Sequence, residues 1–298
     1  MTGRELEPGV PGDPSSRRGA TGLALAAIGL WSSLAALSVE LAHVPPLLLV
    51  GCSLCIGSLV GVPRFREWRV PWPTLLLGCY GLFGYHFCLF MALRFAPPVE
   101  ANLVNYLWPL LMVLLAPLVL RGARLGARHV AGALAGLAGT VVLVSAEGAP
   151  DGSGRHLLGY LLGLAAALMW STYSLFTRRV RPFPTGAVGG FCALSGLLAL
   201  GAHVWLEPPY CPSLRELALL VPLGLGPMGA AFFLWDAALK RGDPRSIGTL
   251  AYLTPLLSTG WLALFAGGEL GPRAGVALAL ILAGAWLGNR QPRRAPGR

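Results

Sequence analysis

The sequence predicts an all-α integral membrane protein, with ten transmembrane helices arranged as two inverted five-helix repeats around a central cavity. Three observations support this fold class. Of the 298 residues, 55% are hydrophobic and only 12% are charged, against roughly 25% charged in soluble domains. The hydrophobic residues form blocks of about 20, the length at which a helix spans a bilayer. Positive charges gather in alternate loops, and the second half of the chain repeats motifs of the first.

The ten predicted spans follow one another with short polar loops between them. They are residues 20–41, 45–62, 72–93, 100–120, 127–145, 157–177, 186–206, 215–239, 246–266 and 272–289. A soluble helical core would need amphipathic helices with one charged face each. Stretches such as 75–93 contain no Asp, Glu, Lys or Arg on any face. Pro and Gly interrupt several spans, which membrane helices tolerate when neighbouring helices satisfy the freed backbone groups.

The net charge of +10 follows from topology and not from a nucleic-acid site. When the loops are taken alternately, 19 of the 23 Lys and Arg residues fall on one side of the membrane. The other side holds only Arg94, Arg155, Arg215 and Arg273. Cytoplasmic loops carry the excess of Lys and Arg in membrane proteins. We therefore expect both termini in the cytoplasm, membrane lipid around the spans, and no nucleic-acid partner.

The second half of the chain echoes the first. Tyr-Leu-Trp-Pro-Leu-Leu at 106–111 returns 146 positions later as Tyr-Leu-Thr-Pro-Leu-Leu, and Trp-Ser-Ser at 31–33 corresponds to Trp-Ser-Thr at 170–172. Each half holds five spans, an odd number, so the halves should cross the membrane in opposite senses. Inverted repeats are typical of transporters, because rocking one half against the other opens either side in turn. The predicted organisation is a cytoplasmic tail (1–19), a first repeat (20–145), an outer linker (146–156), a second repeat (157–289) and a cytoplasmic tail (290–298).

These motifs carry a resemblance to a known family. The five-plus-five inverted spans, the Trp-Ser-Ser/Thr pair and the Asn-Tyr-Leu-Trp-Pro run at 105–109 resemble the drug/metabolite transporter superfamily (EamA-like) over essentially the whole chain. Within it, that run and the Tyr-His pair at 85–86 resemble the YddG-type aromatic amino acid exporters. The resemblance implies a basket-shaped bundle of ten helices in a bacterial inner (plasma) membrane, with a central substrate cavity. It also implies that the protein exports aromatic amino acids.

Polar and aromatic side chains deep in the spans are the candidates for lining that cavity, because polar groups avoid the lipid-facing surface. Span 100–120 has the densest set, on a helix face about 100° wide. The predicted substrate-binding residues are Trp31, Tyr85, His86, Asn102, Asn105, Tyr106, Trp108, Trp170, Ser174 and Tyr252. The stripe of Tyr80, Phe83, Phe87 and Phe90 is expected to pack or face lipid. The alternative for the asparagines and His86 is that they only hydrogen-bond neighbouring helices.

Two prolines at matching positions of the repeats are predicted hinges. Pro109 and Pro255 lack an N–H, so the carbonyls of Asn105 and Ala251 lose their helical partners. Discontinuous helices near the membrane midplane can offer backbone groups to a substrate or act as hinges. A plain kink without substrate contact is the alternative.

The charges inside the spans limit the substrate class. Asp236 lies one turn from Lys240, so a local ion pair is expected there. Both lie near a span end, and no acidic residue, Arg or Lys lies deep in a span, which disfavours organic cations, nucleotide sugars and phosphorylated metabolites; His86 is the only ionisable residue well inside a span. Aromatic surface with neutral polar groups suits a neutral amino acid with a bulky side chain, such as an aromatic amino acid or methionine. A broad-specificity metabolite or drug efflux carrier, or a sugar transporter of the same superfamily, is the alternative.

An intramembrane enzyme is the competing class of function. Such an enzyme needs a base beside a nucleophile or clustered metal ligands. The sequence has no His-Glu-x-x-His, no Gly-x-Ser-x-Gly, no Walker A motif and no deep carboxylate pair. We therefore expect no catalytic residues, no metal and no cofactor. A facilitator is expected, with His86 as the alternative proton carrier. The oligomeric state stays open: Gly132, Gly136, Gly139, Gly284 and Gly288 permit close helix contact within one subunit, as in a monomer, or between subunits.

Overall fold

The computed structural model describes residues 14–34, 37, 39–120, 123, 125–144, 156–266 and 272–289. Within these residues the chain folds into helices joined by turns, without any strand. The predicted tail 290–298, residues 1–13 of the predicted tail 1–19 and most of the predicted linker 146–156 lie outside the described residues.

Helices build both halves of the described part of the chain. The first half contains α1 (Pro14–Ser32), η1 (Val39–Leu41), α3 (Pro46–Ser58), η2 (Leu59–Trp68), α4 (Trp72–Cys79), η3 (Tyr80–Gly84), α5 (Tyr85–Phe95), α6 (Pro98–Asn105), α7 (Trp108–Val119) and α8 (Ala127–Val144). The second half contains α9 (Leu157–Phe176), α10 (Ala187–Leu206), α11 (Leu214–Leu225), η6 (Gly226–Ala230), α12 (Ala231–Arg241), α13 (Pro244–Leu250), α14 (Leu253–Ala266) and α15 (Pro272–Asn289).

Six helical runs among the described residues are long and apolar enough to cross a membrane. They cover Pro46–Trp68, Trp72–Phe95, Ala101–Val119, Leu157–Phe176, Ala187–Leu206 and Leu214–Arg241. Two shorter apolar helices cover Ala127–Val142 and Gly275–Leu287. The prediction of an all-α integral membrane protein is therefore confirmed at the level of several membrane-spanning helices.

The first predicted span, 20–41, contains a break. The α1 helix ends at Ser32 and a turn follows at Ser33, while Leu34 and Leu37 are again helical and η1 covers Val39–Leu41. The Ser32 and Ser33 hydroxyls donate to the carbonyls of Gly29 and Leu30, each across 2.7 Å. Such local bonds compete with the backbone pattern of a helix. In the second predicted span, 45–62, α3 stops at Ser58 and a 3₁₀ helix follows.

The two predicted proline breaks are confirmed. The α6 helix ends at Asn105 and α7 begins at Trp108, while α13 ends at Leu250 and α14 begins at Leu253. Within these turns the N–H groups of Leu107 and Ala251 bond to carbonyls only three residues back. Pro109 follows the first turn by two residues and Pro255 follows the second by three, and each proline lacks the N–H that would have continued the helical bonding.

Two short π-helical segments interrupt the chain at corresponding positions. The η3 segment separates α4 from α5, and η6 separates α11 from α12. Their first residues, Tyr80 and Gly226, are 146 positions apart, which is the offset of the repeated Tyr-Leu-x-Pro motif. Single π-helical turns inside α-helices often occur at functional sites.

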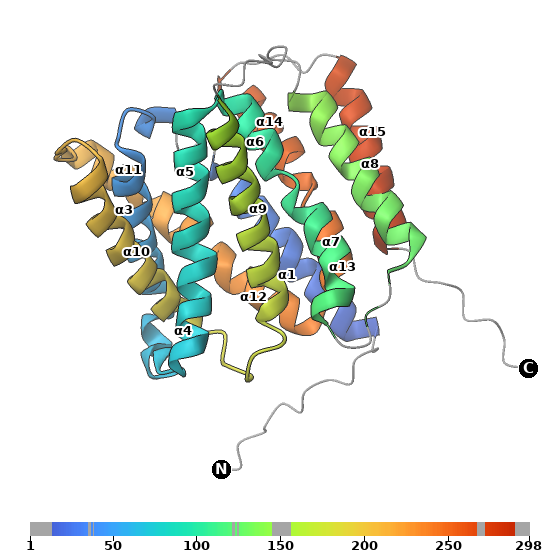
Figure 1. Ribbon diagram of the computed structural model, residues 1–298, viewed down its shortest axis with the longest axis horizontal. Coiled ribbons are helices and arrows are strands. Elements are labelled where there is room, and N and C mark those ends of the chain that lie inside the picture. Colours follow the sequence, from blue (N-terminus) through green and yellow to red (C-terminus); the bar gives the residue numbers. More distant parts are fainter. Residues whose placement is uncertain are drawn as a thin grey trace, which may run out of the picture.

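The helices pack as a series of pairs (Figure 1). At one end of the long axis α8 lies against α15, and at the other α3 lies against α10 and α11. Between them α1 packs on α12, and α5 packs on α9. The broken helices α6–α7 and α13–α14 complete the middle, where α7 contacts both α9 and α13. This arrangement brings α1, α5, α7, α9 and α12 together around the centre.

The glycines of α8 and α15 serve contacts within this chain. A Cβ atom on Gly284 would lie 2.6 Å from the carbonyl oxygen of Gly132, and one on Gly139 would lie 2.9 Å from that of Ala277. Only glycine permits so close an approach of the two backbones. The sequence left open whether these glycines permit helix contact within one subunit or between subunits. The contacts of Gly284 and Gly139 lie within one subunit.

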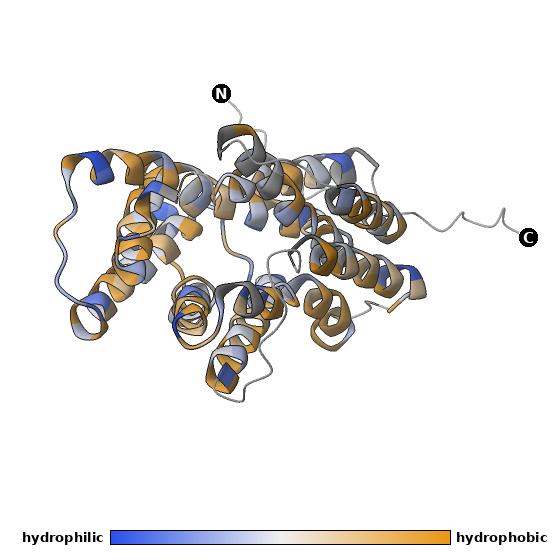
Figure 2. Cartoon of the chain, turned by 90° about the horizontal axis from the view of Figure 1, so that it is seen from above, coloured by the Kyte–Doolittle hydropathy of each residue, from blue (hydrophilic) through white to orange (hydrophobic). Residues whose placement is uncertain are grey.

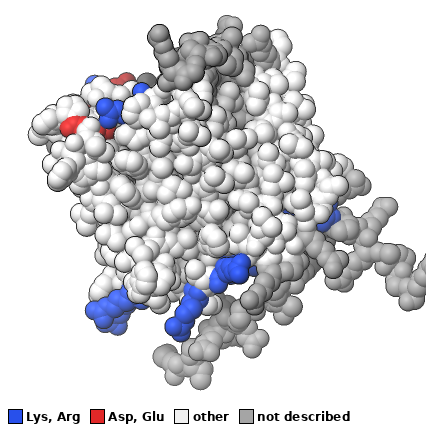
Figure 3. Space-filling model, viewed as in Figure 1, with Lys and Arg blue, Asp and Glu red and all other residues white. Residues whose placement is uncertain are grey.

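The outer surface is apolar along the helices and charged at two ends. Large apolar side chains such as Leu118, Val204 and Leu264 are exposed, and hydrophobic residues predominate along the helices (Figure 2). On the face shown in Figure 3, charged side chains lie toward opposite ends with uncharged surface between them. One end, which we call the basic end, carries Arg64, Arg66, Arg178, Arg181 and Arg241. Glu40, Arg94, Glu207 and Arg215 lie at the opposite end.

Candidate functional site

A cavity of about 470 Å³ lies between the central helices. This volume is within the range of roughly 300–1,000 Å³ usual for small-molecule sites. Side chains of α1, α3, α5, α6, α7, α9, α12 and α14 line it. The cavity reaches residues 41–46, which connect α1 to α3 at the end opposite the basic end. It therefore leads from the centre toward one end of the molecule.

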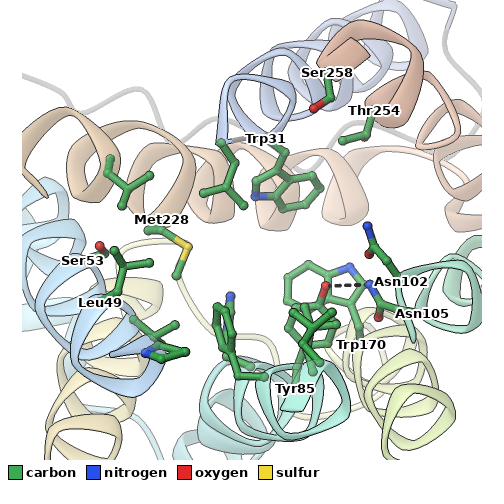
Figure 4. Close-up of a pocket in the computed structure, with 18 of the residues that line it drawn as sticks. Trp31, Leu49, Ser53, Tyr85, Asn102, Asn105, Trp170, Met228, Thr254 and Ser258 are labelled. Carbon is green, nitrogen blue, oxygen red and sulfur yellow. Dashed lines mark hydrogen bonds between the residues drawn. The ribbon is translucent and has the colours of Figure 1, made fainter. Parts of the chain in front are cut away.

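The structure brings together eight of the ten predicted substrate-binding residues on the wall of this cavity. They are Trp31, Tyr85, His86, Asn102, Asn105, Tyr106, Trp108 and Trp170. Their helices come from both halves of the chain, so no single span contains the site. Figure 4 shows Tyr85, Asn102, Asn105 and Trp170 on one side and Trp31 across from them.

Ser174 and Tyr252 do not line this cavity. The Ser174 hydroxyl is fully buried and accepts a hydrogen bond from Trp235 Nε1 at 3.2 Å. Tyr252 is fully buried in a separate cluster with Val113, Ala133 and Ile281, between α7, α8 and α15. Gly136 leaves the space that the Tyr252 ring fills. The helix break at Ala251–Tyr252 places this ring toward α8, a direction that uninterrupted helical spacing does not predict.

Four tryptophans close the cavity on the side of the basic end. Trp31 contacts Trp170 edge-to-face at a centroid distance of 5.7 Å and Trp235 at 5.1 Å. Trp108 contacts the same two rings at 6.4 and 5.7 Å. Phe232 lines the cavity one turn before Trp235, which does not line it. The cluster thus separates the cavity from the C-terminal turns of α12. Edge-to-face and tilted contacts are the favourable geometries for aromatic rings.

His86 lies on the cavity wall with one ring nitrogen bonded within its own helical run. Its Nδ1 lies 2.6 Å from the carbonyl oxygen of Leu82. Because a carbonyl only accepts, Nδ1 donates, and Nε2 of the neutral ring carries the lone pair. The ring also packs edge-to-face on Tyr85, at 4.9 Å between centroids.

Among the described residues, the cavity wall carries no Lys, Arg, Asp or Glu. The expected ion pair of Asp236 and Lys240 is present at 2.6 Å, on the basic side of Trp235 and away from the cavity. Among the described residues, no three His, Cys, Asp or Glu side chains come together as a metal site would require. The site therefore offers aromatic faces and neutral hydrogen-bonding groups to a ligand.

Several lining residues escaped the sequence analysis. They are Leu49 and Ser53 of α3, Phe90 of α5, Met228 and Phe232 near the start of α12, and Thr254 and Ser258 of α14. Phe90, expected to pack or face lipid, packs against the core and also lines the cavity, because it follows His86 by one helical turn and shares its face. That spacing was a usable signal. Leu49 and Met228 carry no such signal, because an apolar side chain in a span faces lipid equally well.

Comparison with known families now decides the class of protein. The sequence pattern of the EamA-like transporter family matches residues 17–145 and again residues 157–290, nearly the whole chain. This chain belongs to the EamA-like transporter family. The match confirms the predicted superfamily, and it confirms the prediction that the protein is a transporter and not an enzyme.

Two curated relatives narrow the comparison for this EamA-like transporter. A protein of Ancylobacter novellus, named aromatic amino acid exporter YddG, is 44% identical over 289 residues, which cover 94% of this chain and 100% of the relative. A protein of Salmonella typhimurium with the same name is 30% identical and covers 82% of this chain and 88% of the relative. The similarity to both extends well beyond the motifs quoted from the sequence.

A solved crystal structure has the same fold. It superposes on the EamA-like transporter described here with a TM-score of 0.87 at 43% sequence identity. The match covers 92% of this chain and 97% of the other. The likeness therefore extends over the whole helical bundle, including the helices that build the cavity.

Proposed function

We propose that this protein exports aromatic amino acids across the bacterial inner membrane, with methionine and other neutral amino acids as further substrates. The observation that carries the proposal is the cavity, which has five of the predicted tryptophans and tyrosines on its wall and, among the described residues, no charged side chain. Aromatic side chains of a ligand stack favourably on such rings. A net-neutral ligand needs no countercharge there. The names of the two relatives support the same substrate class.

The architecture proposed for this exporter is ten transmembrane helices in two inverted repeats, 20–145 and 157–289. The family pattern matches two consecutive segments close to these ranges. The packing supports the repeat as well. In the two repeats α1 corresponds to α9 and α5 corresponds to α12, and α1 packs on α12 just as α9 packs on α5. The helix breaks and the π-helical segments occur at equivalent positions in both halves.

The proposed orientation places the basic end and both termini in the cytoplasm, by the distribution of Lys and Arg. The cavity then faces the outside, and the tryptophan cluster closes it toward the cytoplasm. Alternating access requires a second state in which this closure opens. The breaks before Pro109 and Pro255 are the proposed hinges, because they lack regular helical bonds. Transport is proposed to run down the substrate gradient.

Counterflow in proteoliposomes tests the proposal. Purified protein is reconstituted without a pH gradient, the vesicles are loaded with unlabelled phenylalanine, and entry of labelled phenylalanine is followed. We expect rapid counterflow that tyrosine and tryptophan inhibit, with no inhibition by a nucleotide sugar or a cationic dye. Inhibition by the dye or the sugar alone would instead assign the broader efflux or sugar-transport function.

A further inference from the structure

One side-chain pair on the cavity wall has incomplete hydrogen bonding. Asn105 of α6 is only 4% exposed, and its Nδ2 donates to the Tyr85 hydroxyl of α5 across 3.4 Å (Figure 4). The other amide atom, Oδ1, is buried and has no hydrogen-bond partner among the described residues. Buried polar atoms in native proteins are nearly always paired. An unpaired oxygen on the wall of a cavity therefore indicates that a ligand supplies the missing donor.

The pair offers one donor and one acceptor to such a ligand. The Tyr85 oxygen accepts from Asn105, so the Tyr85 hydroxyl hydrogen is free to donate, while Asn105 Oδ1 is free to accept. If the amide were turned round, Tyr85 would donate to Oδ1. The amide N–H and the phenol oxygen would then be free, again one donor and one acceptor. The complementarity of the pair does not depend on the orientation of the amide.

A zwitterion matches this pair better than an ion of either sign. Within the part of the chain that the structure describes, the lining has no charged side chain to compensate a net charge, and burying an unpaired charge is strongly unfavourable. An α-ammonium group supplies donors and an α-carboxylate supplies acceptors, with no net charge. Asn102 lies beside Asn105 in Figure 4, and Trp170 lies next to the same pair. The polar head of an amino acid can therefore bind Asn105 and Tyr85 while its ring packs on Trp170 and Trp108.

We propose that Asn105 and Tyr85 bind the zwitterionic head of the substrate. Asn105 Oδ1 accepts a hydrogen bond from the α-ammonium group, and the Tyr85 hydroxyl donates to the α-carboxylate. The pair thereby selects free amino acids over amines and acids that carry the same ring. This inference rests on the proposed function, since it concerns the same cavity.

Three ligands with one ring test the inference: phenylalanine, phenethylamine without the carboxylate, and 3-phenylpropionate without the ammonium group. Each competes with labelled phenylalanine in counterflow. We expect phenylalanine to compete about tenfold better than either analogue, because each analogue leaves one buried partner unpaired. In Asn105→Leu, phenylalanine and phenethylamine should weaken about tenfold and 3-phenylpropionate much less. In Asn105→Asp, which keeps the shape of the residue, phenethylamine should improve relative to phenylalanine.

The control variant is Tyr80→Phe, which removes a tyrosine hydroxyl that bonds Thr172 outside the cavity, at 2.9 Å. It should leave all three competitions unchanged. If both Asn105 variants weaken the three ligands by one common factor, Asn105 is only structural and the inference is overturned, while the proposed function stands. If phenylalanine fails to compete in the unmodified protein, the proposed function itself falls. Asn105→Asp keeps the test decisive where Asn105→Leu does not fold.

Discussion

Trp108 and Trp170 meet at the floor of the cavity although they come from α7 and α9, in different halves of the chain. Their rings are nearly perpendicular, with an interplanar angle of 88°. Tyr85 packs on Trp170 at 5.2 Å from the cavity side. A substrate ring that reaches the floor of the cavity contacts these faces. At the scale of residues, the proposed substrate class thus depends on aromatic rings that three different helices, α5, α7 and α9, bring together.

The tryptophan floor leads to a prediction about substrate preference. In Trp108→Ala or Trp170→Ala, phenylalanine transport should fall about tenfold or more. One aromatic contact contributes roughly 0.5–1.5 kcal/mol beyond burial, and the lost apolar area adds about 25 cal/mol per Å². Threonine transport should fall less, because threonine has no ring. Initial rates in proteoliposomes measure both.

The control for this prediction is Trp205→Ala. Trp205 is 88% exposed on the surface of α10, so its removal should leave both rates unchanged. Equal losses for phenylalanine and threonine in the cavity variants would show that the tryptophans only support the fold.

At the scale of helices, the pairing of α8 with α15 depends on glycine. The contact between Gly284 and Gly132 is so close that even one methyl group would displace a backbone. Gly284→Ala should therefore lower the free energy of unfolding by about 1–3 kcal/mol, the usual cost of overpacking. Thermal unfolding in detergent measures the shift.

The same helix offers a matched control in Gly275→Ala. A Cβ atom at Gly275 meets nothing within 4 Å. Alanine there should keep or raise the stability, because it is a better helix former than glycine. A fall of equal size in both variants would mean that helix propensity, and not the contact with α8, sets the result.

The basic end is held closed by contacts between α12 and the segment that joins α9 to α10. Lys240 Nζ bonds Asp236, the Phe183 carbonyl at 2.9 Å and the Thr185 hydroxyl at 3.3 Å. Arg178 donates to the Leu239 carbonyl at 2.9 Å. The bonds of Lys240 and Arg178 between these two segments lie directly beyond the tryptophan cluster, so an opening toward the basic end has to break them. The bond from Lys240 to Asp236 lies within α12 and orients the ammonium group for these contacts.

Asp236→Asn should weaken this closure. A hydrogen bond to a charged group contributes roughly 1.5–3 kcal/mol against about 1 kcal/mol for a neutral one. The open state should gain in population by several-fold. The measurement uses Ser174→Cys in a protein without the six native cysteines. Because position 174 is buried in the closed state, a larger open population should raise the rate at which a thiol reagent alkylates this cysteine from the basic end.

The exposed pair of Arg215 and Glu40, at 2.8 Å on the opposite end, provides the control for this measurement. Exposed ion pairs contribute little, so Arg215→Met should leave the alkylation rate of Ser174→Cys unchanged. An unchanged rate in Asp236→Asn as well would show that the ion pair does not hold the closure.

At the scale of the whole molecule, the proposed inverted repeat makes a prediction about topology. Cysteines introduced at Gly152 and Pro208 should react with an impermeant thiol reagent applied to intact spheroplasts. Those at Arg66 and Arg181 should react only after permeabilisation, because the positive residues mark the cytoplasmic side. Reaction of both sets from outside would contradict the inverted arrangement.

The sequence by itself determined the class of protein and the positions of its helices. The bilayer imposes a fixed length on apolar blocks, and Pro acts on its own helix, so both leave local patterns that can be counted along the chain. The helical stretches from 72 to 95 and from 157 to 176 lie close to their predicted bounds for this reason. The repeat motifs and the site residues of span 100–120 were found in the same way.

Only the tertiary structure decided which side chains meet. Ser174 has the spacing of a cavity residue, yet Trp235 of another helix takes its hydroxyl. Tyr252 turns toward α8 because Gly136 leaves room there, and Leu49 and Met228 reach the cavity without any distinguishing pattern. The physical reason is that a bilayer and a protein interior are both apolar, so hydropathy marks where a helix runs but not which of its faces another helix, lipid or a ligand covers.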